Sequence, residues 1–303
     1  MNKYKVCSLF SGCGGFDLGF IEAGFDIVWA NDIDKFASIS YRRNIGEHLI
    51  EGDLKNIPIS SIPKHDILIA GFPCQPFSIM GNEKGFEDDR GSLFFHIAKI
   101  VGAHRPRIVV LENVGKILEH RKGETFNVIK RVLEEELKYK IFYRVLNSSD
   151  FGVPQTRNRV FIVCFRNHDV EYTFPEINPS KLKLKDILEE NVDNKYYLSE
   201  KIKKTILSSG TGGYDSKPEI DLDIARPLCA TMAKMHRAGQ DNYVTTNGRV
   251  RRLTPRECAR LQGFSERYQI VVSDCQAYKQ FGNAVTVPVA AAVAKSIKNT
   301  KGW

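Results

Sequence analysis

Short apolar runs alternate with helix-like segments along the first 165 residues, and this alternation restricts the fold more than any other feature of the chain. Runs such as residues 67–70 and 108–111 are typical of strands buried on both faces, whereas residues 92–101 have the pattern of a helix. Alternating strands and helices favour βαβ units around a parallel sheet. The sequence therefore predicts an α/β, doubly wound domain with a mostly parallel sheet. We expect strands at residues 6–10, 27–30, 48–50, 67–70, 108–111, 141–146 and 160–165, and helices at 16–23, 34–43, 92–101, 125–137, 254–261 and 287–297.

The sequence changes in character after Phe174. Prolines, glycines and serines, together with weak periodicity, predict a smaller, loop-rich domain from residue 175 onward. Regular structure is expected to resume at Thr254, because Thr254-Pro255-Arg256-Glu257 is typical of a capping box with proline at the first helical position. The last helix is apolar on one face, so we expect it to pack back onto the first sheet.

Composition narrows the class of protein. Hydrophobic residues make up 42% and charged residues 26% of the 303 residues, which is typical of a soluble protein. No apolar run approaches the roughly 18 residues that span a membrane, and the N-terminus leads into a strand, so a cytoplasmic location is expected. Seven cysteines form no C-x-x-C pair, which indicates neither a disulfide framework nor a metal site.

Positive charge is concentrated near one end of the chain. The net charge is +8, and the segment from Lys234 to Arg260 holds seven basic residues against two acidic ones. Such a segment is suited to phosphate contact, as in a nucleic-acid interface. Ordinary solvated surface is the alternative interpretation.

Two strand ends bear groups that suit covalent catalysis. Cys74 stands in the proline-stiffened turn Phe72-Pro73-Cys74-Gln75, directly after the strand at 67–70. In open α/β sheets this position faces a ligand crevice, so the thiol is a candidate nucleophile, although free cysteine is more often a buried hydrophobe. Glu112 ends the next strand, where it is either a solvated strand end or an acid paired with the thiol.

A glycine loop at residues 10–16 follows the first strand and opens a helix, as in nucleotide-binding sites. Asp32 ends the second strand, where an acid accepts hydrogen bonds from a ribose, and Asp53 ends the third. The loop lacks the third glycine of the dinucleotide fingerprint. A nucleoside without a pyrophosphate, such as S-adenosylmethionine, therefore fits better than a nicotinamide cofactor.

Arg157 and Arg159 precede and enter the last strand of the first domain, and strand alternation points both side chains the same way. Paired arginines suit a phosphate, a carboxylate or a base carbonyl, but they are equally compatible with surface charge.

Six motifs in a fixed order resemble those of the DNA (cytosine-5) methyltransferases of bacterial restriction–modification systems. The resemblance covers nearly the whole chain and leaves only about residues 174–250 unmatched. The motifs are Phe10-Ser11-Gly12-x-Gly14-Gly15, Gly71-Phe72-Pro73-Cys74-Gln75-Pro76-Phe77-Ser78, Glu112-Asn113-Val114, Gln155-x-Arg157-x-Arg159, Arg252-Leu253-Thr254-Pro255-Arg256-Glu257-Cys258-Ala259-Arg260 and Gln280-Phe281-Gly282-Asn283-Ala284-Val285.

The resemblance implies an S-adenosylmethionine-dependent methyltransferase fold and an enzyme that methylates C5 of a flipped-out cytosine in a short duplex DNA site. S-adenosylhomocysteine is then the product, no metal is needed, and the enzyme is expected to be a monomer that acts on nucleoid DNA. Residues 1–174 with 283–303 correspond to the catalytic and cofactor-binding domain, 175–252 to the target-recognition domain and 253–282 to a hinge. The recognition sequence itself cannot be predicted.

The same resemblance assigns residues by position. Cys74 matches the nucleophile that adds to C6, Glu112 the acid at N3, and Arg159 the residue at O2, with Arg157 nearby; residues 78–92 match a loop that closes over DNA. Asp32 stands where the family usually has Glu, so we expect it to reach the ribose through water. Cofactor-binding positions are Phe10, Gly12, Gly14, Asp32, Ile33, Asp53, Leu54, Pro73, Leu93 and Asn283, and DNA-binding positions are Ser78, Lys234, Arg237, Gln240, Arg251 and Arg252.

Two other functions remain open. A tRNA cytosine-5 methyltransferase has the same architecture, but that branch is expected to carry a Cys-Phe-Thr signature that the variable region lacks. A catalytically silent DNA-binding module would tolerate the loss of Cys74 or Glu112, and both are present.

Overall fold

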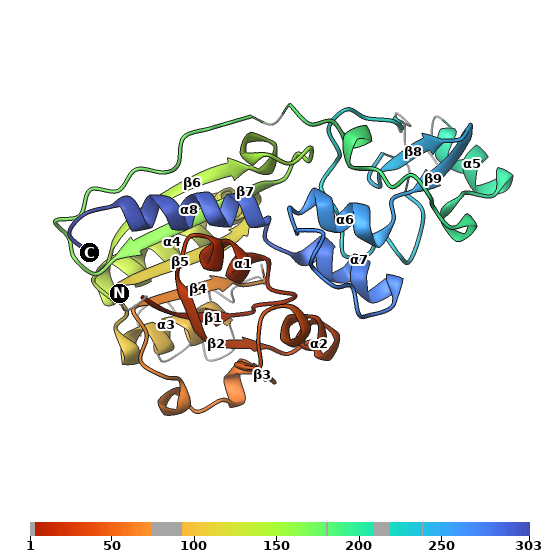
Figure 1. Cartoon of the computed structure of the whole chain (residues 1–303). Coiled ribbons are helices and arrows are strands. Elements are labelled where there is room, and N and C mark those ends of the chain that lie inside the picture. The colour runs from red at the N-terminus through yellow and green to blue at the C-terminus, as the bar shows by residue number, and fades with distance from the viewer. Residues whose placement is uncertain (1–3, 74–92, 180, 209–218, 238) are drawn as a thin grey trace.

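The computed structural model describes residues 4–73, 93–179, 181–208, 219–237 and 239–303. A seven-stranded sheet forms the larger part, with the strand order β3-β2-β1-β4-β5-β7-β6 (Figure 1). Its neighbouring strands are parallel except that β7 runs antiparallel to β5 and β6. The predicted mostly parallel sheet is thus confirmed. The strands are β1 (Lys5–Leu9), β2 (Asp26–Asp32), β3 (Leu49–Glu51), β4 (Ile67–Gly71), β5 (Ile108–Val114), β6 (Lys140–Asn147) and β7 (Asn158–Phe165).

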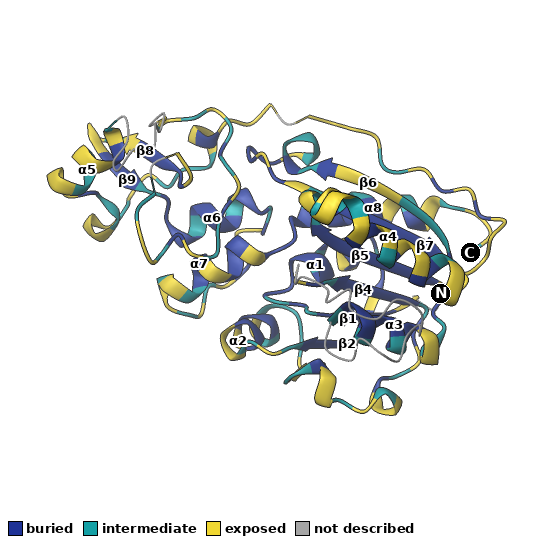
Figure 2. Cartoon of the chain, turned by 180° about the vertical axis from the view of Figure 1, so that it is seen from behind, coloured by how far each residue is buried: buried dark blue, intermediate teal, exposed yellow. Residues whose placement is uncertain are grey.

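Helices cover both faces of this sheet. They are α1 (Gly15–Glu22), α2 (Lys35–Asn44), α3 (Leu93–His104), α4 (Glu124–Arg131) and α8 (Val287–Asn299). Strand alternation divides the core: Leu68 and Ala70 belong to the cluster with α3 and α4, while Ile67 and Ile69 belong to the cluster with α1 and α8. Figure 2 shows the central strands β4 and β5 in the buried colour between helices with exposed outer faces, whereas the edge strand β6 carries intermediate and exposed residues.

The last helix packs on the first sheet, as predicted. Val289 and Val293 of α8 are buried in the same cluster as the strand residues Ile67 and Ile69. Gly19 of α1 permits this approach, because a Cβ atom there would collide with Ala290. The helix predicted at 125–137 is α4 followed by a π-helical turn at Val132–Glu136.

A smaller part lies beside the large sheet. It contains α5 (Glu200–Leu207) and a hairpin of β8 (Tyr243–Thr246) and β9 (Arg249–Arg252), with α6 (Pro255–Leu261) and α7 (Asp274–Asn283) between the hairpin and the sheet (Figure 1). The capping box at the start of α6 is confirmed, since the Thr254 N–H donates to Glu257 Oε2 at 2.8 Å and the Glu257 N–H donates to Thr254 Oγ1 at 3.2 Å.

The hairpin was not predicted, although the sequence contains its turn. Asn247 and Gly248 connect the two strands with φ angles of +51° and +70°. Asn-Gly with two positive φ angles is the preferred two-residue hairpin turn. Helices α5 and α7 were also not predicted. Within the described residues, no helix is both long and apolar enough to cross a membrane.

Candidate active site

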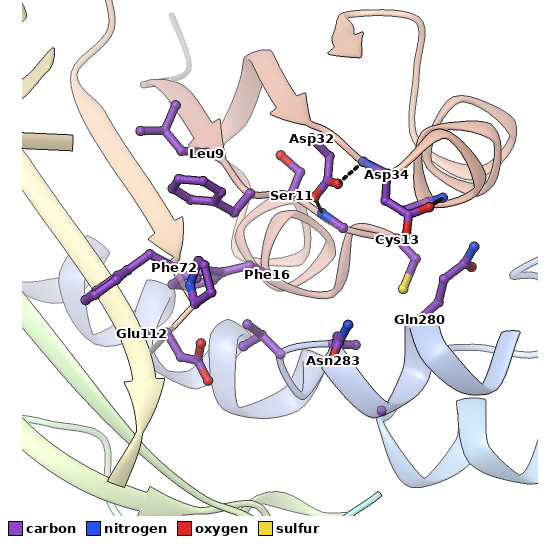
Figure 3. Close-up of a pocket in the computed structure, with 18 of the residues that line it drawn as sticks. Leu9, Ser11, Cys13, Phe16, Asp32, Asp34, Phe72, Glu112, Gln280 and Asn283 are labelled. Carbon is purple, nitrogen blue, oxygen red and sulfur yellow. Dashed lines mark hydrogen bonds between the residues drawn. The ribbon is translucent and has the colours of Figure 1, made fainter. Parts of the chain in front are cut away.

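A cavity of about 360 Å³ opens at the carboxyl ends of β1, β2, β4 and β5 (Figure 3). Parallel strands bring their carboxyl ends to one edge of the sheet, so residues distant in sequence converge there. The far wall comes from the end of α7 and the residues that follow it. The lining residues fall in the segments 8–13, 32–34, 71–73, 112–114 and 279–285, together with Phe16, Ala37, Arg157 and Arg159; within 279–285, Phe281 does not line the cavity.

Asp32 fixes the glycine loop at one end of the cavity. Its Oδ2 accepts the Gly12 N–H at 2.7 Å, and its Oδ1 accepts the Asp34 N–H at 2.7 Å. Burial raises the pKa of this carboxyl, while the two backbone hydrogen bonds act in the opposite direction. The backbone φ of Phe10 and of Gly12 is +56°, which turns the loop sharply after β1. Both oxygens of the shorter acid therefore accept backbone N–H groups, one in the glycine loop and one at the start of α2.

The predicted cofactor residues divide into two groups. Phe10, Gly12, Asp32, Ile33, Pro73 and Asn283 line the cavity. The other four, Gly14, Asp53, Leu54 and Leu93, do not line the cavity.

Local structure explains three of these four positions. A Cβ atom on Gly14 would collide with the Ile45 side chain, so this glycine permits close packing. Asp53 accepts the Lys55 N–H at 3.0 Å, and Leu54 is buried in the core.

Other residues that line the cavity were not predicted. Lys279 and Gln280 come from α7, and Lys279 forms an ion pair with Asp34. Gln280 belongs to the same sequence motif as the predicted Asn283, Gln280-Phe281-Gly282-Asn283, so this motif could have indicated it. Ser8, Ser11 and Cys13 were adjacent to predicted positions on the first strand and glycine loop.

Glu112 and Arg159 form an ion pair at the other end of the cavity. Arg159 Nε lies 3.1 Å from Glu112 Oε1, and Glu112 is 8% exposed. The antiparallel pairing of β5 with β7 places them together, since Val114 is the direct partner of Arg159. Burial raises the pKa of Glu112, and the two arginines Arg159 and Arg157 oppose this shift. A carboxyl with a raised pKa is suited to donate a proton to a ligand.

The turn that leads to Cys74 begins beside Glu112. Gly71 at the end of β4 is the direct strand partner of Glu112. The side-chain amide of Asn113 donates to the Phe72 carbonyl at 2.9 Å, which fixes the start of the turn. Cys74 and Ser78 themselves lie outside the described residues, as do residues 78–92 of the predicted closing loop.

Arg157 lines the same cavity, but its guanidinium group points to backbone carbonyls. Nη1 donates to the Leu228 carbonyl at 3.1 Å, and Nη2 donates to the carbonyls of Gly282 and Ala284 at 2.9 and 3.1 Å. Burial lowers the pKa of Arg157 to about 9, and the neighbouring Arg159 acts in the same direction.

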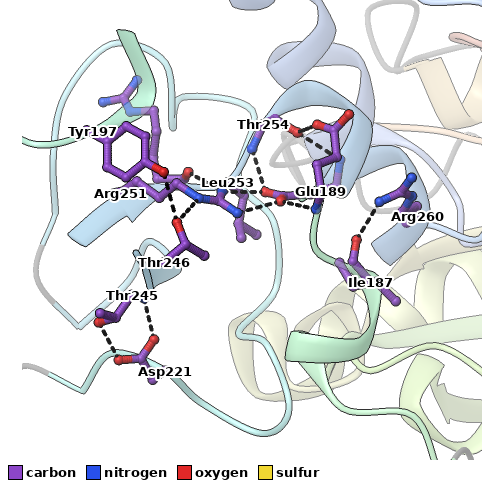
Figure 4. A network of polar contacts seen from close by, with 12 residues as sticks. Ile187, Glu189, Tyr197, Asp221, Thr245, Thr246, Arg251, Leu253, Thr254 and Arg260 are labelled. Carbon is purple, nitrogen blue, oxygen red and sulfur yellow. Dashed lines mark hydrogen bonds and ion pairs between the residues drawn. The ribbon is translucent and has the colours of Figure 1, made fainter. Parts of the chain in front are cut away.

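Arg251 corrects one expectation for the smaller part. Its guanidinium group has no exposed surface and forms two hydrogen bonds of 2.8 and 2.7 Å with Glu257. Figure 4 shows Arg251 within this network of polar contacts, bonded to Thr246. The prediction that Arg251 contacts phosphate is wrong for this structure, because a fully buried guanidinium group cannot reach a ligand in solvent. Strand β9 turns this side chain toward the first turn of α6, where Glu257 already serves the capping box.

The other predicted DNA-binding residues that the structure describes lie at or near the surface. Lys234 and Gln240 are exposed. Arg237 pairs with Asp241 at 2.8 Å, and Arg252 Nη2 lies 2.8 Å from His236 Nε2. Burial lowers the pKa of His236, and Arg252 lowers it further.

The strand order, the antiparallel β7 and the cavity at the strand ends define the fold of S-adenosylmethionine-dependent methyltransferases. The model of the C-5 cytosine-specific DNA methylase family matches residues 4–299. The chain therefore belongs to this family and is a DNA cytosine-5 methyltransferase of the Type II restriction–modification type.

Relatives agree with this assignment, and a solved structure shares the fold. The chain is 42% identical to the Type II methyltransferase M.SsoII of Shigella sonnei, over 98% of this chain and 81% of the relative. It is 42% identical to M.NlaX of Neisseria lactamica, over 97% and 96% of the two chains. The Dnmt2 methyltransferase of S. pombe has the same fold, with a TM-score of 0.80 at 21% identity over 98% of this chain and 99% of that one.

Proposed function

We propose that this enzyme transfers the methyl group of S-adenosylmethionine to C5 of a flipped-out cytosine through a covalent adduct between Cys74 and C6. The buried Glu112–Arg159 pair carries the proposal, because it lies in one cavity with the glycine loop and beside the turn that leads to Cys74. The proposal thus rests on a single cavity that contains both the glycine loop, suited to a nucleoside, and the acid Glu112.

The cavity suits S-adenosylmethionine at its glycine-loop end. Ile33 lines the cavity and yet is 66% exposed, so an apolar surface is available for an adenine ring. Phe10 and Asn283 line the same space. When bound, S-adenosylmethionine supplies an electrophilic methyl group. The lining residues that would hold it are Phe10, Gly12, Asp32, Ile33, Pro73 and Asn283.

Each catalytic residue has a defined task in this mechanism. The Cys74 thiolate adds to C6, and Glu112 shares its proton with N3, so that the negative charge arriving on the ring is neutralised. Arg159 holds Glu112 in place through their ion pair and, in this proposal, binds O2 of the cytosine. C5 of the adduct would then accept the methyl group that bound S-adenosylmethionine supplies, with S-adenosylhomocysteine as the second product. Loss of the C5 proton to water, return of the N3 proton to Glu112 and elimination of the Cys74 thiolate restore the aromatic ring.

The target base must leave the duplex, because the thiolate and the methyl group approach C6 and C5 from above or below the ring plane, where the stacked neighbouring bases lie. We propose that residues 175–252 read a short duplex site, with Lys234, Arg237, Gln240 and Arg252 at the DNA and Ser78 in the closing loop. Residues 1–174 with 283–303 hold the chemistry, and 253–282 form the hinge. The enzyme is proposed to act as a monomer on DNA in the cytoplasm.

Methyl transfer to duplex DNA tests this function. Bisulfite sequencing of DNA from cells that express the protein identifies the methylated site, and labelled S-adenosylmethionine then measures the rate on a duplex that contains it. Glu112→Gln should lower the single-turnover rate by about 10²-fold, in the range of general acid–base groups, with little change in cofactor affinity. Glu119→Gln is a matched control, because Glu119 is exposed and does not line the cavity.

Two results would contradict the proposal. Methylation of tRNA in preference to duplex DNA would assign the enzyme to the alternative substrate. A Glu112→Gln enzyme that loses cofactor binding but keeps a normal single-turnover rate would place Glu112 in a different site.

A further inference from the structure

One segment of the smaller part, residues 225–230, is docked on the residues that lead into β7. The Ala225 N–H donates to the Pro154 carbonyl at 2.8 Å, and the Thr156 N–H donates to the Ala225 carbonyl at 2.9 Å. Gln155 Oε1 then accepts the Leu228 N–H at 2.8 Å. Two strand-like bonds and one side-chain bond therefore attach this segment to the chain immediately before Arg159.

Arg157 completes the attachment from the other side of Leu228. Gln155 holds the N–H of Leu228, and Arg157 holds its carbonyl at 3.1 Å. Both backbone groups of this single residue are thus bound by side chains of the same five-residue motif. Because a buried carbonyl and a buried N–H each need a partner, these bonds fix the position of Leu228 relative to β7.

The second nitrogen of Arg157 binds the end of α7. Nη2 donates to the carbonyls of Gly282 and Ala284, which lie in the last turn of α7 and at its C-cap. The C-terminus of a helix carries a partial negative charge and unsatisfied carbonyls, so a cation is stabilised there. This contact explains how a guanidinium group that is only 2% exposed is tolerated without a hydrogen-bonded carboxylate.

The two attached segments serve different parts of the reaction. Gly282, Asn283 and Ala284 line the cofactor end of the cavity, whereas residues 225–230 belong to the proposed recognition domain. They also touch each other, because a Cβ atom on Gly282 would collide with the backbone nitrogen of Ala230. Arg157 is the side chain that bonds to both.

We propose that Arg157 is a positioning residue that couples the wall of the cofactor pocket to the recognition segment 225–230. This inference rests on the proposed function for the identity of the two ligands, S-adenosylmethionine and DNA. The coupling itself depends only on the hydrogen bonds of Arg157 within the protein. The cofactor, by ordering residues 282–285, also orders the segment that faces DNA.

Hydrogen–deuterium exchange of the whole protein tests the coupling. The N–H groups of Leu228 and Ala284 are both hydrogen-bonded, so peptides covering 225–230 and 282–286 report on the two segments. Arg157→Gln should raise exchange in both peptides by about tenfold or more, the effect expected when a charged hydrogen bond to a buried group is lost. Arg256→Gln is the matched control, because Arg256 also donates to two backbone carbonyls but lies outside the cavity lining.

Addition of S-adenosylmethionine distinguishes coupling from a general loss of structure. In the unmodified enzyme the cofactor should slow exchange at 282–286 and also at 225–230. In Arg157→Gln the slowing at 282–286 should persist, while that at 225–230 disappears. Arg157→Lys replaces Arg157→Gln in this experiment if the latter does not fold. It keeps the charge, but a single ammonium group cannot bond to both segments, so it should show the same loss of coupling.

Three outcomes would overturn the inference. The cofactor could slow exchange at 225–230 equally in the variant and in the unmodified enzyme, or it could slow exchange at 282–286 but not at 225–230 in the unmodified enzyme. The third is a rise in exchange at only one of the two peptides in the variant without cofactor. Absence of any effect of the cofactor on the unmodified enzyme would instead contradict the proposed function. In that case, the exchange of the free proteins still decides the role of Arg157.

Discussion

The buried pair of Arg251 and Glu257 offers a quantitative test of how the smaller part is held together. Both side chains have no exposed surface, and they share two hydrogen bonds of 2.8 and 2.7 Å. Arg251 also donates to Thr246 Oγ1 at 2.9 Å, and Glu257 accepts the N–H groups of Thr254 and Glu189 at 2.8 Å each. The pair therefore links β8, β9 and the first turn of α6.

Removing either partner leaves an unpaired charge where water cannot replace it. Arg251→Met and Glu257→Gln should each lower the free energy of unfolding by about 3–5 kcal/mol, whereas an exposed pair contributes about 1 kcal/mol or less. For a chain of this size the loss corresponds to a fall of roughly 6–10 °C in the unfolding midpoint. The double variant should be less destabilised than the sum of the single variants, because neither charge is then left alone.

Equilibrium unfolding in urea and thermal unfolding of the four proteins measure these changes. Glu266→Gln is the control, because the Arg260–Glu266 pair belongs to the same region but Glu266 is 64% exposed. Small and additive effects, equal to that of Glu266→Gln, would refute the reasoning, since they would mean that solvent reaches the pair. Arg251→Met should also leave the salt dependence of DNA binding unchanged in the folded protein.

Asp17 is buried and accepts hydrogen bonds from Ser8 and Tyr41, and burial raises its pKa from 3.8 to about 6. The folded state therefore binds this proton more tightly, and stability falls as pH rises from about 4 to 6. Asp17→Asn should remove about 2 kcal/mol of that fall, measured as the difference in unfolding free energy between these two pH values. An unchanged pH profile in Asp17→Asn would contradict the assignment. Arg237→Ala should lower discrimination between cognate and one-mismatch duplexes by about 1–3 kcal/mol, whereas Arg252→Ala should weaken binding to all duplexes alike and reduce its salt dependence, as methylation kinetics at two salt concentrations will show. An Arg237→Ala enzyme with an unchanged mismatch profile would exclude this residue from base recognition.

The sheet could be predicted from the sequence because its strands are buried on both faces. Residues 67–70 and 108–111 are continuous apolar runs that end in Gly71 and Glu112, and the structure places these ends side by side. The glycine loop and Asp32 were predicted for the same reason, since parallel strands place their carboxyl ends at one edge. The local sequence pattern is sufficient to predict these site residues, because the parallel sheet itself brings the ends of its strands close together.

The contacts of Arg157 and Arg251 could not be predicted in this way. Arg157 binds three backbone carbonyls, and a carbonyl carries no sequence signal at Leu228, Gly282 or Ala284. Arg251 pairs with Glu257 only because β9 is followed directly by α6. In the sequence, Glu257 is interpreted only as part of the helix cap, so Arg251 is left without an acidic partner and is expected to be exposed to solvent. Both arginines were expected to meet a ligand, and both bind the protein itself.

Covalent trapping tests the central claim most directly. A duplex with 5-fluorocytosine at the methylated position blocks the loss of the C5 substituent after methyl transfer, so the bond between Cys74 and C6 cannot break. With S-adenosylmethionine present, mass spectrometry should find one protein joined to one methylated duplex in a denaturant-stable adduct, and Cys74→Ser should form none while still binding the duplex. An equal yield of adduct from Cys74→Ser, or normal methylation of the unsubstituted site by that variant, would contradict the account.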